Sequence, residues 1–255
     1  MKKEEVVQYH IQLKRGDVGR YVLLPGDPGR CEKIAAFFDD PQFVAQNREF
    51  TTYTGTLLGE KVSVVSTGIG CPSTAIAVEE LIKIGADTFI RVGTSGGIQP
   101  ETKTGDVAIV TAAIRDEGTT PQYLPIEFPA VADINVVLAL REAAEKLELP
   151  YHLGVTQSKD SFYGEVEADR MPLADQLHTR WKAWVEGGAI CSEMESAAIF
   201  ILASIHRKRA GGVMMMVGAG EGLPETKIDK ELFHGDRAIR MAIEGVKILI
   251  ERDRE

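Results

Sequence analysis

The chain has 255 residues, of which 44% are hydrophobic, 26% charged and 7% aromatic, the composition of an ordinary globular protein. This composition excludes a disordered, fibrous or membrane-spanning chain. The 38 acidic residues outnumber the 29 basic ones, and the formal net charge of -9 is opposite to the basic surface that nucleic-acid binding needs. We therefore expect no nucleic-acid partner, and an anionic ligand must be met by cations gathered locally.

The terminal sequence and the cysteines indicate the cellular location. MKKEEVVQYH lacks the apolar core of a signal peptide, and no window approaches the roughly 18 apolar residues of a membrane helix. Cys31, Cys71 and Cys191 are odd in number, widely separated and without CxxC spacing, so they predict neither a disulfide framework nor a zinc cluster. We expect a cytoplasmic protein with no membrane partner and with reduced, mostly buried thiols.

Short apolar runs alternate with segments of helical periodicity, which indicates an α/β fold. The runs that predict buried strands are Tyr21–Leu24, Val62–Ser66, Thr88–Val92, Val107–Thr111, Leu153–Thr156 and Gly212–Val217. The segments that predict helices are Cys31–Phe38, Ser73–Ile84, Ile134–Leu147, Met194–Ile205 and Ile228–Ile250. No linker, low-complexity tract or repeat divides the chain, so we expect one domain over residues 1–255.

The stretch Phe50–Leu58 alternates like an antiparallel strand and predicts a hairpin with Lys61–Ser66 around Gly59 and Glu60. We therefore expect a mixed, mainly parallel sheet flanked by helices. In such sheets ligands bind beyond the carboxyl ends of the strands, so functional residues are expected in the turns that follow each apolar run.

The turn after the first predicted strand, Pro25–Arg30, is a candidate anion site. Its glycines free backbone N–H groups at a helix N-terminus, and Arg30 adds a forked cation. A structural interpretation of the same turn has Asp27 as the N-cap and Pro28 at the first helical position, and this capping role fits either function.

The segment Arg91–Gly97 is the most informative, because it places an arginine near the end of a buried strand, followed by hydroxyls and glycines. An arginine in an otherwise apolar strand is costly to bury unless it meets an anion. The alternative is a structural salt bridge to a carboxylate. The similar turn at Gly26 and Arg30 favours an anion site.

Two familiar nucleotide-binding motifs are not matched. Ser66–Ser73 resembles the dinucleotide fingerprint GxGxxG only superficially, because Ser73 stands where the third glycine is needed. No GxxxxGK[ST] sequence occurs. We therefore expect neither a Rossmann NAD site nor P-loop nucleotide hydrolysis.

Two later segments carry groups suited to a nucleoside. Asp160–Glu165 follows a predicted strand and includes Phe162, on which a base can stack, although such a ring also suits a hydrophobic core. Glu193 and Glu195 lie at the front of an apolar helix. Carboxylates there either complement the helix dipole or accept hydrogen bonds from two vicinal sugar hydroxyls.

Taken in order, six motifs resemble the uridine phosphorylase branch of the trimeric and hexameric nucleoside phosphorylase family, over nearly the whole chain. They are PGDPGR at 25–30, NREFTTYTG at 47–55, STGIGCPS at 66–73, RVGTSGGIQ at 91–99, DSFYG at 160–164 and SEMES at 192–196. The resemblance implies a nucleoside-phosphorylase-like three-layer sandwich. It also implies a pentosyltransferase of nucleoside salvage or catabolism, which uses inorganic phosphate to cleave a ribonucleoside, uridine above all, into free base and ribose 1-phosphate.

The same resemblance implies site residues and partners. Phosphate would be held by Gly26, Arg30, Arg91 and Thr94, with Arg48 from a neighbouring subunit. Ribose would be held by Glu193, Met194 and Glu195, with His10 from the partner, and the base by Ser95, Gly96 and Phe162. Arg30, Arg91 and Glu195 would act in catalysis. Glu49, Ile69 and Ser73 match positions that bind a monovalent cation, here potassium, between subunits. No organic cofactor is implied, and the expected assembly is a homohexamer built as a trimer of dimers.

The chain departs from the family pattern where the base is recognised. Uridine phosphorylases carry a glutamine shortly after the FYG-type turn and an arginine just beyond, whereas this chain has Glu165, with Arg170 somewhat further along. An ionised glutamate only accepts hydrogen bonds, which suits the adjacent N–H donors of guanine better than uracil. Alternatively, Glu165 points to solvent and does not contact the base.

The late loop Val217–Gly222 is a second departure. Purine phosphorylases of the family place an aspartate there to protonate the base, and this chain offers only Glu221. The loop also lacks a supporting arginine found in some uridine phosphorylases, and its glycines suggest a lid. The alternatives to uridine cleavage are therefore a guanosine or inosine phosphorylase, a noncatalytic nucleoside-binding module, and a hydrolase that uses water.

Overall fold

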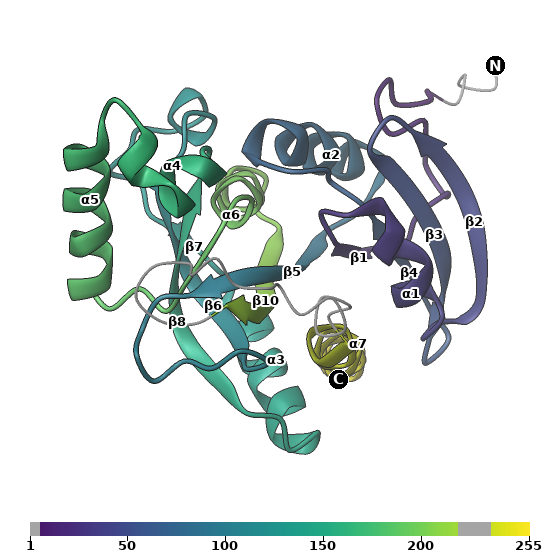
Figure 1. The fold of residues 1–255 in the computed structure, drawn as a ribbon. Helices are drawn as coiled ribbons and strands as arrows, with labels where there is room; N and C mark the ends of the chain where they lie inside the picture. The colour runs from purple at the N-terminus through teal and green to yellow at the C-terminus, as the bar shows by residue number, and fades with distance from the viewer. Residues whose placement is uncertain (1–5, 219–235) are drawn as a thin grey trace.

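The computed structural model describes residues 6–218 and 236–255, which form a mixed β-sheet with helices on both faces (Figure 1). The strands are β1 (Tyr21–Leu24), β2 (Asp39–Asn47), β3 (Phe50–Leu57), β4 (Glu60–Val65), β5 (Thr88–Gly97), β6 (Val107–Asp116), β7 (Ala130–Val131), β8 (Tyr151–Lys159), β9 (Cys191–Glu193) and β10 (Arg209–Gly218). The α-helices are α1 (Cys31–Ala35), α2 (Cys71–Ile84), α3 (Ile134–Lys146), α4 (Phe162–Val166), α5 (Ala174–Glu186), α6 (Ser196–Ile205) and α7 (Asp236–Arg252). Short 3-10 helices are η1 (Pro28–Arg30), η2 (Thr120–Gln122) and η3 (Ala168–Arg170). The predicted α/β class is confirmed.

The sheet closes on itself at one end. Its strand order is β10-β6-β8-β9-β5-β1-β4-β3-β2, and β10 also pairs with β5. The strands from β10 to β5 therefore form a ring, from which β1, β4, β3 and β2 extend as an open wing. Strand β5 belongs to both parts, because it pairs in parallel with β1 and with β10 and, at its carboxyl end, antiparallel with β9.

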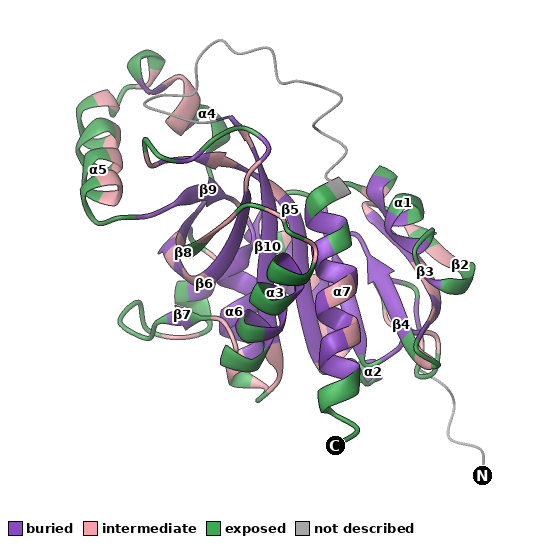
Figure 2. Ribbon diagram, turned by 90° about the horizontal axis from the view of Figure 1, so that it is seen from below, coloured by how far each residue is buried: buried purple, intermediate pink, exposed green. Residues whose placement is uncertain are grey.

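Two hydrophobic clusters lie on opposite faces of the sheet. One contains the buried sides of α2 and α6, and the other contains those of α1, α3 and α7. Figure 1 shows α2 and α6 on one side of β5 and β10, with α3 and α7 on the other. In Figure 2 the inner face of α7 is buried, whereas α5 is exposed or half-buried along its whole length. The central strands are therefore covered by helices on both faces.

The predicted hairpin forms one residue earlier than expected. Strands β3 and β4 are antiparallel, with Leu57 opposite Glu60, so the turn residues are Leu58 and Gly59. Both have positive φ values, 51° and 76°, as a tight two-residue hairpin turn requires. The sheet is also more mixed than predicted, because β2, β9 and β10 each make an antiparallel pairing.

Other predicted boundaries differ from the structure. The first predicted helix ends at Ala35 instead of Phe38, because the chain turns into β2, whose exposed residues gave no strand signal. Helix α5 was not predicted, since none of its residues is buried. The last predicted helix continues to Arg252. Its first residues, Ile228–Gly235, lie outside the described residues, as do Glu221 and the rest of the predicted lid after Gly218.

No helix in the described part of the chain is long and apolar enough to cross a membrane.

Candidate active site

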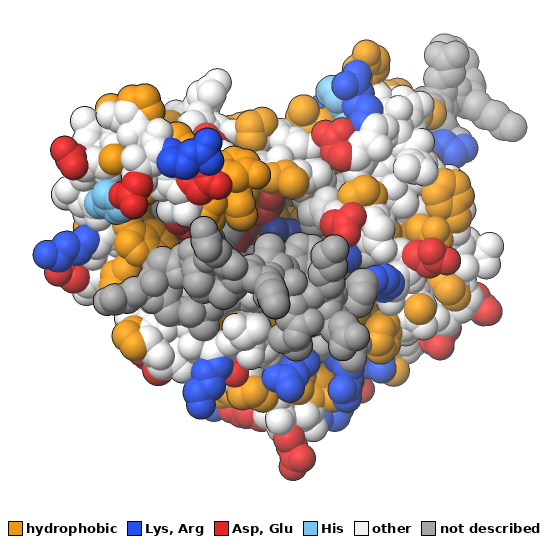
Figure 3. Space-filling view, in the orientation of Figure 1, with side chains coloured by type: hydrophobic (Ala, Val, Ile, Leu, Met, Phe, Trp, Pro, Cys, Tyr) orange, Lys and Arg blue, Asp and Glu red, His pale blue; other side chains and the backbone are white. Residues whose placement is uncertain are grey.

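The turns after several strands meet around one cavity of about 710 Å³. The lining comes from the turns after β1, β4 and β8, from β5 itself and from the segment that joins β9 to α6, with Glu49 and Val217 at its edge. Figure 3 shows acidic and basic side chains inside a hollow of this face. The predicted site residues that line the cavity are Gly26, Arg30, Glu49, Ile69, Ser73, Arg91, Thr94, Ser95, Gly96, Phe162, Glu165, Glu193, Met194 and Glu195. The structure thus brings together most of the predicted set.

Three predicted residues do not line this cavity. Arg170 lies in η3, its side chain is 75% exposed, and it pairs with Glu167. The interpretation of Arg170 as a base-binding residue is therefore corrected: α4 and η3 carry it away from the cavity. His10 and Arg48, which were expected to act on a neighbouring subunit, lie near the N-terminus and at the exposed turn between β2 and β3.

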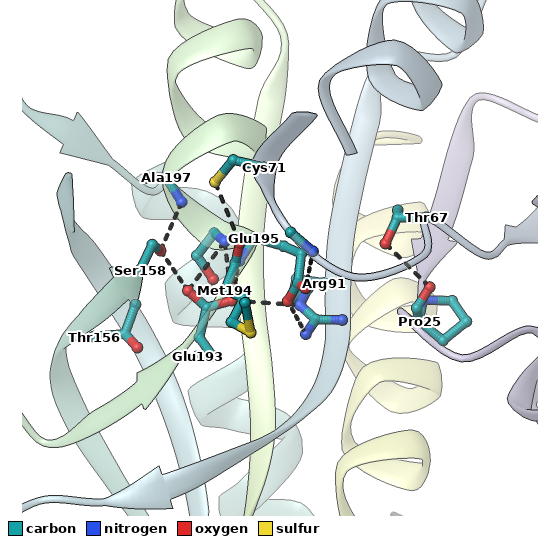
Figure 4. Close-up of polar contacts among 12 residues, drawn as sticks. Pro25, Thr67, Cys71, Arg91, Thr156, Ser158, Glu193, Met194, Glu195 and Ala197 are labelled. Atoms are coloured by element: carbon teal, nitrogen blue, oxygen red, sulfur yellow. Dashed lines mark hydrogen bonds and ion pairs between the residues drawn. The ribbon is translucent and has the colours of Figure 1, made fainter. Parts of the chain in front are cut away.

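An arginine and two glutamates form the buried centre of the site (Figure 4). Nη2 of Arg91 pairs with Oε2 of Glu195, and its Nε lies 3.5 Å from Oε2 of Glu193. Each of the three residues is at most 5% exposed. Burial of one cation beside two carboxylates leaves an excess of negative charge next to Arg91.

Arg91 satisfies both interpretations of a buried arginine, since it forms a salt bridge and keeps donors for another ligand. Within the described residues, its Nε and Nη1 have no hydrogen-bond partner. A Cβ at Gly26 would lie 3.5 Å from this Nη1, so Arg91 lies directly beside the turn after β1. Unpartnered buried N–H groups are costly, which favours an anion at this position.

The turn after β1 adds the second cation. Asp27 is the N-cap of η1 and accepts a hydrogen bond from Gly29 N–H at 2.8 Å, which confirms the predicted cap. This cap holds Arg30 on the cavity wall, where it is 6% exposed. Burial, followed by the repulsion of the nearby Arg91 cation, lowers the pKa of Arg30. An anion placed between the two arginines relieves that repulsion.

Glu193 organises the turn that presents Glu195. The short strand β9 carries Glu193 to the end of β8, opposite Ser158. Its carboxylate accepts hydrogen bonds from the backbone N–H groups of Glu195 at 2.8 Å and Ser196 at 3.0 Å, and from the Ser158 hydroxyl. Of the two roles considered for these glutamates, Glu193 therefore takes the one at the start of the helix. The carboxylate of Glu195 instead faces Arg91.

Glu195 also meets the start of a second helix. Its Oε1 accepts a hydrogen bond of 2.7 Å from the N–H of Gly70, the N-cap of α2. Gly70 has a φ of 93°, which glycine adopts at little cost. Burial, only partly opposed by Arg91, raises the pKa of Glu195. Its carboxylate therefore needs the Arg91 cation to stay ionised.

Glu49 and Ser73 form a smaller polar pair at the cavity edge. The Ser73 hydroxyl donates to Glu49 Oε1 at 2.6 Å, and this hydrogen bond is the main reason why the pKa of Glu49 is lowered. Ile69 lies in the loop between β4 and α2, just before the first turn of α2 that carries Ser73, and is 77% exposed. The three residues proposed from the sequence for a cation thus lie together on one edge.

Lys159 is a site residue that the sequence analysis missed. It is the last residue of β8 and lines the cavity, and its ammonium pairs with Glu165 Oε2 at 3.0 Å and donates to Ser192 Oγ. The predicted strand there ended at Thr156, so the search for strand-end residues began at Asp160. The rule that identified Arg91 would have identified Lys159 had the strand been predicted to its end.

The Lys159–Glu165 pair separates this cavity from a neighbouring one. The second cavity has a volume of about 850 Å³ and lies against β8, α4 and α5. It is larger but takes no part of its lining from the turns after β1 or β5. We therefore assign the chemistry to the smaller cavity. Glu165 does not point to solvent, because Lys159 and Ser192 hold it in the wall.

Gly93 gives the first test of the site, because a Cβ there would lie 2.8 Å from Cζ and Nη2 of Arg91. Gly93→Ala is expected to displace the guanidinium and, if an anion binds here, to weaken the binding of inorganic phosphate, used as the probe anion, about tenfold in a calorimetric titration. Gly212→Ala is the matched control, since its Cβ would meet the Arg91 stem at an ordinary 3.6 Å. Equal phosphate affinity in the two variants would contradict the placement of Arg91 in the anion site.

The comparisons with known proteins agree with this geometry. Residues 20–251 match the model of the phosphorylase superfamily. The chain is 52% identical to uridine phosphorylase of Treponema pallidum, covering 96% of this chain and 95% of the relative. It is 46% identical to uridine phosphorylase of Thermococcus kodakarensis, covering 99% and 90%. It is 36% identical to guanosine phosphorylase of Halorubrum lacusprofundi, covering 95% and 99%. The chain belongs to the phosphorylase superfamily.

Proposed function

We propose that this protein is a pentosyltransferase that cleaves uridine with inorganic phosphate to uracil and ribose 1-phosphate. Uridine is preferred because two relatives that match nearly the whole chain, at 52% and 46% identity, are named uridine phosphorylase. The observation that carries the proposal is the buried cluster of Arg30, Arg91, Glu193 and Glu195 around one cavity. It combines a place for an anion with acceptors for sugar hydroxyls.

The residues divide the cavity by charge. Phosphate binds at Gly26, Arg30, Arg91 and Thr94, where buried N–H donors hold its oxygens in a water-poor site. Glu195 accepts hydrogen bonds from ribose hydroxyls, with Met194 beside the sugar and Glu193 holding the turn. The phosphate oxygen attacks C1′ as the bond to the base breaks, and the positive charge that develops on the ribose lies near the two carboxylates. Phe162, Ser95 and Gly96 surround the base.

The test is phosphate-dependent release of base from uridine, thymidine, guanosine, inosine and adenosine. We expect turnover of uridine only when phosphate is present, with ribose 1-phosphate as the second product. Base release at full rate after all phosphate is removed would favour a hydrolase. Nucleoside binding without any turnover would favour a noncatalytic binding module. Either result would refute the proposal.

A guanosine or inosine phosphorylase is the second candidate, and Glu165 favours it. Its carboxylate lines the cavity, where it can accept hydrogen bonds from the adjacent N–H donors of guanine. The relative from Halorubrum lacusprofundi is named guanosine phosphorylase. The nucleoside panel distinguishes the two candidates by the ratio of kcat/KM for guanosine and uridine.

Glu165→Gln is expected to shift this ratio towards uridine, because an amide both donates and accepts, as the uracil edge requires. One well-placed hydrogen bond is worth about 0.5 to 1.5 kcal/mol, so the ratio should change about 2- to 12-fold. The measurement is kcat/KM for both nucleosides. Asp169→Asn, at an exposed carboxylate, is the control. An unchanged ratio would mean that Glu165 does not contact the base.

The complete site is proposed to need a second copy of the chain. His10 would reach the ribose and Arg48 the phosphate of the neighbouring site, and two such sites would make a dimer, with three dimers in a hexamer. Glu80 supports the placement of His10, because its buried carboxylate accepts hydrogen bonds from His10 N–H, Ile11 N–H and the His10 ring. Exposed apolar side chains lie nearby, including Val6, Tyr9 and Ile69. Sedimentation of the protein tests the assembly.

We further propose a potassium site, a cytoplasmic location and a single domain. Glu49, Ser73 and the backbone oxygen of Ile69 offer hard oxygen ligands with one negative charge, which suits a monovalent cation shared with a second subunit. Dependence of the rate on added K⁺ tests this site.

The three cysteines are free and buried, which fits a reducing, cytoplasmic environment. One phosphorylase domain over residues 1–255 is proposed, since the family match covers residues 20–251.

A further inference from the structure

A buried lysine lines the cavity at the end of β8, which β9 separates in the sheet from the strands that carry the two arginines, β5 and β1. Lys159 is 6% exposed and ends β8, next to the turn that carries Phe162. Buried lysines are rare unless they are paired, and this one is paired with Glu165. The proposed chemistry of phosphate and ribose does not use it. Its position beside Phe162 places it where the base is expected.

The ammonium of Lys159 has one donor to spare. It donates to Ser192 Oγ and forms an ion pair with Glu165 Oε2, and the Ser192 hydroxyl in turn lies 2.7 Å from the same carboxylate oxygen. A lysine ammonium has three N–H donors. Among residues 6–218 and 236–255, no further partner engages it, and the side chain lines the cavity. The third N–H is therefore available to a ligand.

Lys159 completes a pattern of alternating charge along the cavity. In the sheet order β1-β5-β9-β8, Arg30 follows β1 and Arg91 lies on β5, Glu193 lies on β9 with Glu195 just after it, and Lys159 ends β8. The cleavage of a nucleoside by phosphate develops the matching pattern: an anionic nucleophile, a cationic ribose and a base that leaves with negative charge. Charges fixed in advance opposite those that develop in the transition state are the strongest source of catalysis in a water-poor site.

We propose that Lys159 is a specificity-determining residue that selects bases with a carbonyl group and stabilises their departure; this rests on the proposed function. As the phosphate oxygen bonds to C1′, the bond from C1′ to the base nitrogen breaks and its electron pair stays with the base. The resulting charge spreads onto a ring carbonyl oxygen, which accepts the third N–H of Lys159. The proton stays on the lysine, and water protonates the base after release.

The selection follows from the hydrogen-bonding groups of the bases. Uracil, guanine and hypoxanthine each present a carbonyl oxygen at the edge where cytosine and adenine present an amino group. An ammonium donates only, so it pairs with the carbonyl and leaves an amino group facing it unpaired. A site built around a buried donor rejects the ligand that cannot accept from it. Glu165 and Ser192 fix the direction of the ammonium and act as positioning residues.

Lys159→Met tests the proposal on the full-length protein. For uridine and inosine, kcat/KM is expected to fall about 10- to 150-fold, as for loss of a charge-assisted hydrogen bond. The affinity for phosphate alone should stay unchanged, and the preference for uridine over cytidine and for inosine over adenosine should shrink. The fall in kcat/KM should be several-fold smaller for 5-fluorouridine than for uridine. Fluorine lowers the basicity of the departing base, which then needs less help from Lys159. Lys103→Met, at an exposed lysine, is the control.

Two outcomes would overturn the proposal: an equal loss with uridine and 5-fluorouridine, as for a merely structural residue, or an unchanged ratio of uridine to cytidine. Because Lys159→Met leaves Glu165 without its counter-charge, Lys159→Met/Glu165→Gln is measured in parallel and should show the same dependence on the leaving base. If the unaltered protein cleaves no nucleoside with phosphate, the proposed function itself fails, which is a different result from a Lys159 variant that leaves the substrate ratios unchanged.

Discussion

Arg91→Ala is expected to cause a large loss of both phosphate affinity and phosphorolysis. Arg91 is 5% exposed; its Nε faces Glu193, whereas its Nη1 has no hydrogen-bond partner among the described residues and is the desolvated donor offered to the proposed phosphate. Truncating one partner of a buried, hydrogen-bonded charge pair costs about 2 to 5 kcal/mol, which corresponds to about 30- to 5,000-fold in affinity or rate. Phosphate affinity by calorimetry and kcat/KM by base release should fall together.

A control is needed because Arg91→Ala also leaves Glu193 and Glu195 buried without their cation. That loss destabilises the fold irrespective of phosphate. The double variant Arg91→Ala/Glu195→Gln removes one of the unpaired charges, and it should recover thermal stability without recovering phosphate affinity. If the single variant bound phosphate as tightly as the parent protein, Arg91 would be a structural arginine only, and the anion site would have to lie elsewhere.

Glu195→Gln is expected to strengthen the binding of phosphate and to lower kcat/KM for uridine. The carboxylate competes with phosphate for Nη2 of Arg91 and repels it, so the neutral amide should tighten phosphate binding several-fold. The ribose, in contrast, loses a charged acceptor, worth about 1.5 to 3 kcal/mol, so kcat/KM for uridine should fall about 10- to 150-fold. Calorimetry with phosphate and steady-state rates with uridine measure the two effects.

Because the changes in phosphate affinity and in kcat/KM go in opposite directions, they distinguish a direct role of Glu195 at the site from a role in folding. A variant that merely distorted the site would weaken both ligands, and one that left it intact would weaken neither. Burial raises the pKa of Glu195, so the amide also resembles the protonated carboxyl, and the same tightening of phosphate binding is expected in the parent protein as pH falls. Weaker phosphate binding in Glu195→Gln would mean that Glu195 supports Arg91 instead of competing for it.

Residues next to strands could be predicted from the sequence because their signal is local. The run Tyr21–Leu24 is an observed strand with the same boundaries, and the capped turn after it places Arg30 at the cavity. Arg91 was identifiable because a charged residue interrupts an apolar run. Lys159 was missed for the converse reason: the polar residues before it, such as Gln157 and Ser158, ended the apolar run early although they are buried in β8.

Positions that depend on long-range packing could not be predicted in this way. Arg170 is close to Glu165 in the sequence, but α4 and η3 turn it outward, and no local pattern indicates that direction. The different roles of Glu193 and Glu195 could not be predicted from the sequence either. Only the pairing of β9 with β8 and β5 decides which carboxylate accepts the backbone N–H groups and which meets Arg91.

By itself, the sequence determined the α/β class, the acidic character of the chain and the strand-end turns that carry glycines and arginines. These follow from periodicity and from turn chemistry, which act over a few residues. The tertiary structure decided that β9 joins the ring of strands and brings Glu195 against Arg91, although 104 residues separate them. It also decided that Lys159 faces the same cavity. Strand pairing between distant segments depends on the packing of the whole sheet, so these placements have no signature in any local stretch of sequence.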